Sequence, residues 1–215
     1  PDQGIIWPLT EDQIHLGPPH VSNFGYAYAK RMLDIQSQAY RQQYGCNFVT
    51  VVPNNLYGPN DNFDLENGHV IPAIIRKVWE AKMTNTVPKF WGDGSPMREF
   101  TFAPDLAHIL LNIIENYNHH EPLNVGNDLN ISIKFLVDKI CEILEYSGEI
   151  EWDSSKPNGQ LKKPSSLSKW LNLQHMGDMP EYNREYTHIS SGLLQTCEWF
   201  KNNYPFIRGV KKAND

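Results

Sequence analysis

The stretch "FVTVVP", residues 48–53, indicates an α/β fold. Its first five residues are apolar or β-branched and show no polar alternation, which is typical of a strand buried on both faces, as in a parallel sheet. The residues before it, from Ser22 or Asn23 to about Tyr44, predict a helix that Gly45 ends. A helix followed by a buried strand is the repeating unit of α/β proteins, so we expect parallel strands here.

Further elements lie on both sides of this strand. Residues 1–21 are rich in proline, glycine and polar residues, which predicts an irregular loop. "PNNLYGPNDNF", residues 53–63, predicts a long loop at the carboxyl end of the strand, where open α/β sheets bind ligands. Helices are predicted at about 70–83, 105–117, 132–146 and 189–203. Short strands are predicted at 123–126, at 149–153 and twice within 89–102, where an Asp93-Gly94 turn suggests a hairpin.

The composition excludes several classes of protein. The chain has 215 residues, of which 40% are hydrophobic and 20% charged, so it can form a core in one domain or two small ones. Its apolar runs are far shorter than the roughly 20 residues that span a bilayer. The net charge of −6 disfavours nucleic-acid binding, which requires a basic face. We therefore expect no membrane and no nucleic-acid partner, and take the cytoplasm as the default compartment.

The three cysteines predict no metal site and no disulfide framework. Cys46, Cys141 and Cys197 lie far apart in the sequence, without a CxxC spacing. Each is interpreted first as a small buried apolar residue.

Tyr26 and Lys30, in "SNFGYAYAKRM" (residues 22–32), form a possible catalytic pair. Four residues apart on a predicted helix, they share one face, and an ammonium beside a phenol favours proton transfer by that phenol. Such a spacing also arises by chance among ten tyrosines. The pair alone therefore leaves open whether these residues are catalytic or only neighbours on an amphipathic helix.

The glycines of "WGDGSPM", residues 91–97, predict a turn rather than a nucleotide site. A dinucleotide fingerprint needs a third glycine where Met97 stands, and it opens a helix rather than lying between two strands. No other glycine-rich phosphate loop occurs in the 215 residues. The usual device for holding a pyrophosphate is thus not found in this sequence.

Several other polar residues have two interpretations each. His69 precedes the predicted helix at 70–83 and is either a surface or capping residue or a group that exchanges protons with a ligand. Lys77, Arg98 and Lys163 could contact phosphate, Arg98 through its planar fork. The alternative is that these three are solvated surface charges.

Four motifs together resemble those of a known family. "SNFGYAYAKRM", "PNNLYGPNDNF", "NGHVIPAIIRK" and "WGDGSPMREF" occur in the order and spacing found in the GDP-L-fucose synthase family of the extended short-chain dehydrogenases/reductases, from about Trp7 to Tyr204. The resemblance implies the carboxyl-terminal part of a Rossmann-like parallel sheet plus a small α/β substrate-binding domain. It also implies NADPH as cofactor, and epimerisation and reduction of GDP-4-keto-6-deoxy-D-mannose to GDP-L-fucose.

The resemblance assigns roles to individual residues. Tyr26 would deliver a proton to O4 as hydride reaches C4, Lys30 would assist it and bind the nicotinamide ribose, and His69 would exchange protons with the sugar during epimerisation. The cofactor-binding residues would be Lys30, Pro53, Asn54, Asn55, Leu56 and His69. The substrate-binding residues would be Lys77, Trp91, Arg98 and Asn158.

The resemblance also implies a domain division and a partner. Residues 1–60 and 100–127 would be the remnant of an NADP-binding Rossmann domain, and residues 61–99 and 128–215 would bind substrate. The helix at 23–44 would form a homodimer interface in the full-length protein.

This sequence departs from the family in two ways. Asn158 stands in "KPNG" where the family has aspartate, which removes a charge-accepting contact. The GxxGxxG and Ser-x-Cys motifs of full-length members lie upstream of Pro1, and none of the three cysteines matches the catalytic one. We therefore expect the isolated chain to be an inactive fragment. The alternatives are another nucleotide-sugar epimerase or dehydratase, and a non-catalytic module that binds a GDP-sugar or dimerises.

Overall fold

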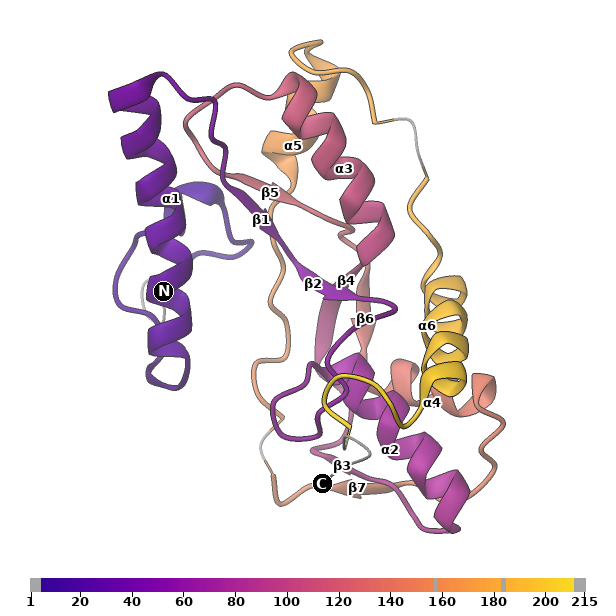
Figure 1. The fold of residues 1–215 in the computed structure, drawn as a ribbon. Coiled ribbons are helices and arrows are strands. Elements are labelled where there is room, and N and C mark those ends of the chain that lie inside the picture. The colour runs from indigo at the N-terminus through magenta and orange to yellow at the C-terminus, as the bar shows by residue number, and fades with distance from the viewer. Residues whose placement is uncertain (1–4, 157, 183–184, 211–215) are drawn as a thin grey trace. The chain divides into compact units, whose positions relative to one another are not determined.

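The computed structural model describes residues 5–156, 158–182 and 185–210, and it divides into two units (Figure 1). The first unit comprises residues 1–54, 105–128 and 163–185, and the second comprises residues 55–104, 129–162 and 186–215. The assignment of cofactor binding to the amino-terminal part and of substrate binding to the remainder stays a prediction.

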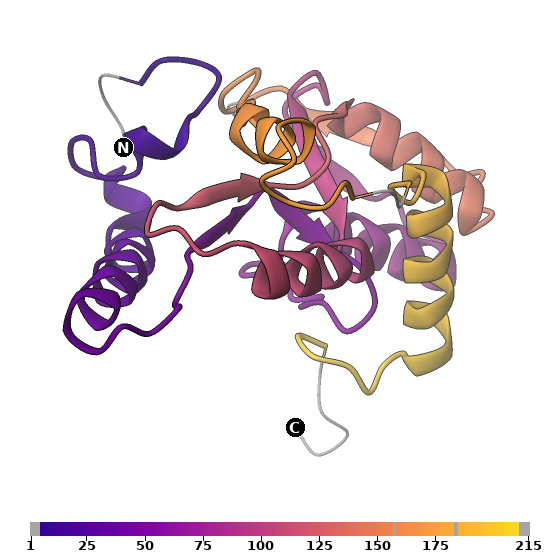
Figure 2. The ribbon, with the colours of Figure 1, turned by 90° about the horizontal axis from the view of Figure 1, so that it is seen from above.

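The first unit is built around a parallel strand pair. β1 (Val51–Pro53) pairs with β5 (Leu123–Val125), and Val51 lies opposite Leu123. The unit also holds helices α1 (Phe24–Tyr44) and α5 (Ser168–His175), most of α3 (Ala103–Asn116), and short 3₁₀ turns at Glu11–Gln13 and Val21–Asn23. Figure 2 shows β1 and β5 running side by side.

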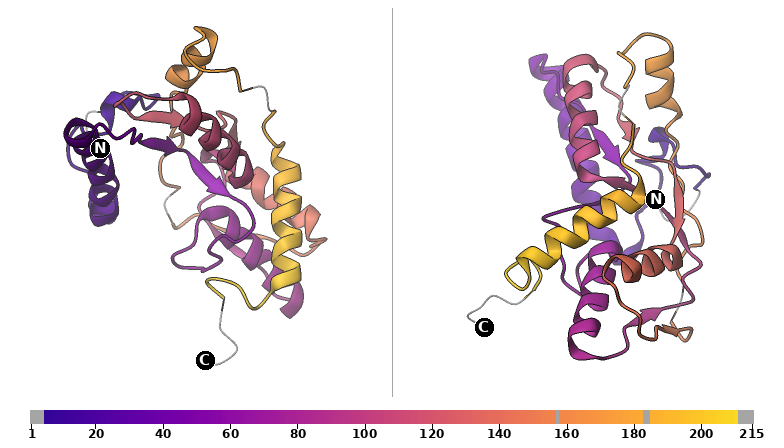
Figure 3. Two further views of the ribbon diagram at one scale, coloured as in Figure 1. Left: turned by 45° about the horizontal axis from the view of Figure 1, so that its top comes forward. Right: turned by 90° about the vertical axis from the view of Figure 1, so that its right-hand side faces the viewer.

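Within its described residues, the second unit holds two small sheets and three helices. β4 (Met97–Phe102) lies between β2 (Asn55–Tyr57), to which it is parallel, and β6 (Asn130–Ser132), to which it is antiparallel. β3 (Lys89–Trp91) pairs in parallel with β7 (Glu151–Asp153). Helix α4 (Ile133–Ile143) contacts both α2 (Val70–Thr84) and α6 (Ile189–Asn203) (Figure 3). The predicted α/β class with parallel strands is confirmed.

A continuous apolar core holds the second unit together. Phe63 and Phe200 are both fully buried, with ring centroids 4.7 Å apart, and Trp199 stacks on Phe63 at 5.9 Å. Burying an aromatic side chain of this size removes a large apolar surface from water, which is the dominant favourable term in folding. Side chains of α2, α4 and α6 therefore pack in one common core.

Several predicted elements are confirmed within a few residues. The helix at 24–44 ends at Gly45, whose φ of 67° lies in the left-handed region that glycine adopts easily. The last helix runs from 189 to 203 as predicted. Ser132 caps α4, because its side-chain oxygen accepts a hydrogen bond from the amide of Phe135.

The predicted hairpin at Asp93-Gly94 is wrong, although both of its strands exist. β3 pairs with β7 and β4 pairs with β2 and β6, so the two strands do not pair with each other. Phe90 of β3 is buried and packs on Trp152 of β7, with ring centroids 5.5 Å apart. Burial of Phe90 against the partly buried Trp152 favours a partner remote in sequence over the adjacent strand.

Three elements were not predicted. β2 lies inside the segment 53–63, α5 begins within the polar segment after β7, and β6 follows β5 closely. Each is short, and none has the periodic pattern that marks a longer element.

The capping bond of α4 allows a stability test. Replacing Ser132 by alanine leaves the Phe135 amide without this acceptor, so we expect the free energy of unfolding to fall by about 1 kcal/mol. Chemical denaturation of both proteins measures the difference. Ser154→Ala, an exposed serine with no helix to cap, is the control; equal stability of Ser132→Ala and wild type would contradict the capping role.

Candidate functional site

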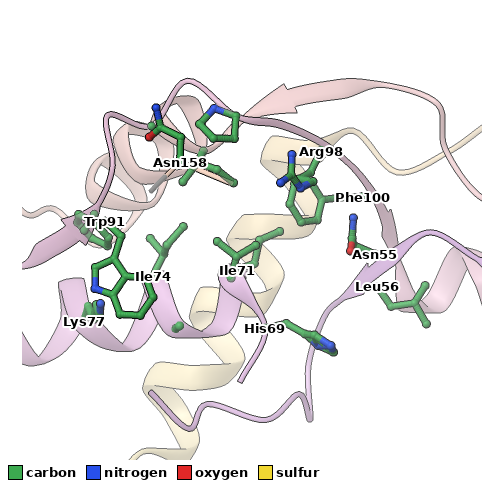
Figure 4. A pocket seen from close by; sticks show the side chains of 16 residues that line it. Asn55, Leu56, His69, Ile71, Ile74, Lys77, Trp91, Arg98, Phe100 and Asn158 are labelled. Atoms are coloured by element: carbon green, nitrogen blue, oxygen red, sulfur yellow. The ribbon is translucent and has the colours of Figure 1, made fainter. Parts of the chain in front are cut away.

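A cavity of about 430 Å³ opens in the second unit (Figure 4). Its walls come from β2, the start of α2, β3 and β4, the first residue of α4, and the segment after β7. The lining residues are Asn55, Leu56, His69, Val70, Ile71, Ala73, Ile74, Lys77, Phe90, Trp91, Gly94, Pro96, Arg98, Phe100, Ile133 and Asn158.

Helix α2 supplies the floor of the cavity. Ile71 and Ile74 are buried in the core and also line the cavity, so the floor is apolar. The helix begins after a tight turn, in which the amide of Gly68 donates to the carbonyl oxygen of Asp64 at 2.9 Å. A side chain at Gly68 would collide with the backbone oxygens of Asp64 and Asn62. This tight turn fixes the position of His69, the next residue, at the start of α2.

Lys77 and Arg98 place two cations beside this apolar floor. The ammonium of Lys77 donates to the backbone oxygen of Lys89 at 3.1 Å and lies 5.6 Å from the ring centroid of Phe90. Nη1 of Arg98 donates to the carbonyl oxygens of Met97 and Gln160, at 2.7 and 2.8 Å. Burial lowers the pKa of Lys77 and that of Arg98. The arginine nevertheless stays protonated in a protein.

Neither cation has a carboxylate partner within the described part of the chain. The seven ion pairs found there involve other residues. A partly buried cation without an opposite charge carries a desolvation cost that an anionic ligand can offset. The cavity is therefore suited to a molecule that bears negative charge.

Trp91 forms the edge of the cavity on the side of Lys77 (Figure 4). Its side chain is 69% exposed, although it is among the largest apolar side chains in the unit. The ammonium of Lys156 lies 6.0 Å from the centre of its ring. An exposed indole at the mouth of a cavity can stack on a flat ligand group such as a base or a sugar ring.

His69, Asn55 and Leu56 lie at another part of the cavity wall (Figure 4). His69 is exposed and precedes α2, and its side chain makes no capping hydrogen bond. The side-chain nitrogen Nδ2 of Asn55 donates a hydrogen bond to the backbone oxygen of Glu99 at 2.8 Å, which holds this side chain against β4. Asn55 and Leu56, two of the four residues of the loop segment 53–56 that are predicted to bind cofactor, thus line the same cavity as the predicted histidine.

The remainder of that loop belongs to the first unit. Pro53 ends β1, and the side chain of Asn54 donates to the backbone oxygen of Asn127 at 2.7 Å. Lys163 also falls in the first unit and does not line the cavity. The six predicted cofactor-binding residues are thus divided between the two units, and their role stays a prediction.

Tyr26 and Lys30 lie together on α1, in the first unit. The ammonium of Lys30 is 5.7 Å from the ring centroid of Tyr26, and both side chains are exposed. The i, i+4 spacing produces this contact directly, because residues four apart on a helix lie on one face. The structure therefore confirms that the two side chains meet, while their catalytic role stays a prediction.

The cysteines have the character of core residues. Burial raises the pKa of Cys141 to about 11 and that of Cys197 to about 12, so both thiols stay protonated at neutral pH. Cys46 is half-buried. Among the described residues, no group of histidine, cysteine, aspartate and glutamate side chains could hold a metal ion. None of the helices described combines the length and the apolar character needed to cross a bilayer.

Sequence reasoning did not single out the apolar floor or Lys156. Ile71, Ile74 and Ile133 come from two helices and gave only the signal of a buried helix face. Lys156 lies in a polar segment, where one lysine is indistinguishable from a solvated charge. Only the tertiary structure shows that these side chains lie at one site, because it brings α2, the start of α4, β3 and the segment after β7 together.

Comparison with protein families gives a match over more than half of the chain. Residues 1–130 match the model described as "NAD dependent epimerase/dehydratase family".

Among curated proteins, this chain is similar to several GDP-L-fucose synthases. It is 41% identical to that of Dictyostelium discoideum over 210 residues, which are 97% of this chain and 63% of that protein. It is 38% identical to that of Sinorhizobium fredii over 197 residues, which are 91% of this chain and 60% of that protein. The chain thus spans about three fifths of the curated relatives it matches. The predicted resemblance to this family is confirmed.

Solved structures agree with the sequence comparison. The structure is similar to that of a GDP-L-fucose synthetase from Naegleria fowleri bound to NADP, with a TM-score of 0.89 and 36% identity, over 96% of this chain and 64% of that one. A GDP-6-OMe-4-keto-L-xylo-heptose reductase from C. jejuni matches with a TM-score of 0.77 at 24% identity, over 93% of this chain and 67% of that one, and shows the fold alone.

Proposed function

Since this chain belongs to the NAD-dependent epimerase/dehydratase family, we propose that it contributes a GDP-sugar pocket and a catalytic pair to an epimerase-reductase. The reaction would be the NADPH-dependent conversion of GDP-4-keto-6-deoxy-D-mannose to GDP-L-fucose. Its similarity to the GDP-L-fucose synthases of other organisms supports this substrate class. The second unit is proposed to bind the substrate, and residues 1–60 and 100–127 are proposed to form part of the NADP-binding domain.

One observation carries the proposal: Lys77 and Arg98, two cations without a carboxylate partner among the described residues, lie in a cavity with an apolar floor that Trp91 borders. A nucleoside diphosphate sugar combines negative phosphates with flat rings, which these groups complement. The planar fork of Arg98 suits a phosphate in particular, while Lys77 acts as a compact charge. A neutral sugar alone would leave both charges without a partner.

The proposed chemistry follows from the 4-keto group of the substrate. This ketone makes the hydrogens at C3 and C5 acidic, so a residue of moderate basicity can remove and return them, and His69 is proposed to take part in this exchange. In the reduction, Tyr26 donates its phenolic proton to O4, and Lys30 stabilises the phenolate that remains. Proton donation by Tyr26 accompanies bond formation at C4, so the product is an alcohol.

NADPH, when bound, supplies the hydride to C4. The residues that would hold it are Lys30, Pro53, Asn54, Asn55, Leu56 and His69. They fit such a group in part: the ammonium of Lys30 forms no ion pair in the described structure, and Asn55 and Leu56 line the cavity. The 215 residues contain no glycine-rich loop for the pyrophosphate.

We also propose that α1 contributes to a homodimer interface. Its buried set is limited to Asp34, whereas many large apolar side chains on it are exposed. Apart from Tyr26, which is proposed to face the substrate, these are Phe24, Tyr28, Met32, Leu33, Ile35, Tyr40 and Tyr44.

Calorimetric titration of the 215-residue chain tests the binding part of the proposal. We expect GDP to bind, because the cavity offers two cations to the diphosphate. We expect NADPH to give no measurable heat, because the sequence has no glycine-rich loop for its pyrophosphate. UDP is the control for base preference. Absence of GDP binding would refute the proposed pocket, and tight binding of NADPH would refute the expectation that these 215 residues do not hold NADPH by themselves.

A chimera tests the catalytic part. The segment of the Dictyostelium discoideum GDP-L-fucose synthase that aligns with this chain is replaced by residues 1–215, and conversion of GDP-4-keto-6-deoxymannose with NADPH is followed. Product formation with inversion at C3 and C5 is the expected result. Reduction without inversion at these carbons would instead favour a different nucleotide-sugar enzyme.

A further inference from the structure

The turn between β3 and β4, residues 92–96, connects the two groups proposed to bind the ligand. Trp91 is the last residue of β3 before the turn, and Arg98 is the second residue of β4 after it. Gly94 and Pro96, within the turn, line the cavity themselves. The conformation of the turn therefore sets how far apart the indole and the guanidinium lie.

The turn adopts backbone angles that glycine takes up readily and other residues rarely do. Gly92 and Gly94 have φ values of 73° and 76°, in the left-handed region. A side chain at Gly92 would collide with the side-chain oxygen of Asn158, and one at Gly94 would meet Trp152 and Lys134. The turn is thus pressed between the segment after β7 and the start of α4.

Asn158 holds this turn by a side-chain hydrogen bond. Its Oδ1 accepts from the backbone amide of Asp93 at 2.9 Å. Since that amide is a donor, the oxygen of Asn158 must face the turn. Hydrogen bonds from Ser95, with a smaller contribution from the Asn158 side chain, hold the pKa of Asp93 below its ordinary value. The side chain of Asn158 therefore affects both the backbone amide and the carboxyl group of Asp93.

The same segment holds Arg98. The backbone oxygen of Gln160 accepts from Nη1 of Arg98 at 2.8 Å. Residues 158–160 thus contact the turn that follows Trp91 and the guanidinium beyond it. A shift of this segment would alter both groups at once.

We propose that Asn158 is a positioning residue for the pocket: its side-chain oxygen holds the 92–96 turn and so sets the separation of Trp91 from Arg98. It acts on the ligand through the turn, whereas the family resemblance implies a substrate contact. The proposal rests on the function proposed above, since the ligand that responds to the turn is a GDP-sugar. An asparagine suits this task because its side-chain oxygen is an acceptor for the amide.

The test combines amide exchange with GDP binding in the 215-residue chain. Asn158→Ala removes the acceptor, so exchange of the Asp93 amide is expected to speed up by about five- to tenfold and the Kd for GDP to rise by about as much. Asn158→Asp retains an acceptor oxygen, and its Asp93 amide is expected to exchange at nearly the wild-type rate. Ser154→Ala, in the same polar segment and outside the cavity lining, is expected to change neither quantity.

The outcomes separate positioning from direct contact. Weaker GDP binding by Asn158→Ala with unchanged Asp93 exchange would overturn the proposal in favour of a ligand contact. Faster exchange with unchanged GDP binding would also overturn it, because the turn would then not matter to the ligand. If the wild-type chain does not bind GDP at all, the proposed function fails and the positioning role fails with it. In that case, slow exchange of the Asp93 amide in the wild-type chain would show that the hydrogen bond to Asn158 is nevertheless formed.

Discussion

Replacing Tyr26 by phenylalanine in the chimera is expected to lower the rate of reduction by about 1,000-fold, because a positioned general acid contributes roughly 10²- to 10⁴-fold. The substitution removes one oxygen and keeps the ring that Lys30 contacts. No proton donor then meets the oxygen at C4. Epimerisation is expected to continue, since it exchanges hydrogens at C3 and C5 and does not use this proton.

The measurement follows both steps in one experiment. In deuterated water, mass spectrometry of the GDP-sugar reports exchange at C3 and C5, while oxidation of NADPH reports reduction. Tyr28→Phe is the matched control, because it removes the same oxygen from an exposed tyrosine two residues further along α1. The converse change, His69→Gln, should impair exchange more than reduction. Equal loss of both steps in Tyr26→Phe would mean that Tyr26 has a structural or shared role.

The second large effect is expected from removing both cations of the cavity. The double variant Lys77→Met, Arg98→Met keeps much of the apolar volume of the two side chains and deletes their charges. A hydrogen bond to a charged group contributes about 1.5–3 kcal/mol, so losing two should weaken GDP binding by at least about 100-fold. Calorimetry with the 215-residue chain measures the change in Kd.

A charge-matched control distinguishes a local effect from a general one. Lys139 and Lys201 belong to the second unit and do not line the cavity. Their joint replacement by methionine changes the net charge equally and should leave the Kd for GDP within about twofold, as a distant surface charge is largely screened by salt. If the Lys77, Arg98 double variant binds GDP as tightly as this control, the diphosphate does not lie between those side chains.

The helices of this protein were largely predictable because their limits are local. Gly45 ends α1 in a left-handed conformation, and Ser132 caps α4 with its own side chain. These signals act over three or four residues and need no knowledge of the remaining chain. The contact between Tyr26 and Lys30 was predictable for the same reason.

The pairing of the strands was less predictable because it depends on remote burial. β3 and β4 look like a hairpin in sequence, yet β3 pairs with β7, more than 50 residues later, where Phe90 meets Trp152. β2 has only three residues, which give no periodic signal, so the sequence predicts a loop there.

The sequence by itself determined the helix limits, the α/β class and, through four ordered motifs, the family. These depend on neighbouring side chains or on the order of residues, which a chain carries before it folds. Only the tertiary structure decided that Lys77, Trp91 and Arg98 border one apolar cavity and that Asn158 holds the turn between the last two. Such a site depends on contacts between segments far apart in the sequence, such as Asp93 and Asn158, which are 65 residues apart, and these form only when burial of the shared core brings the segments together.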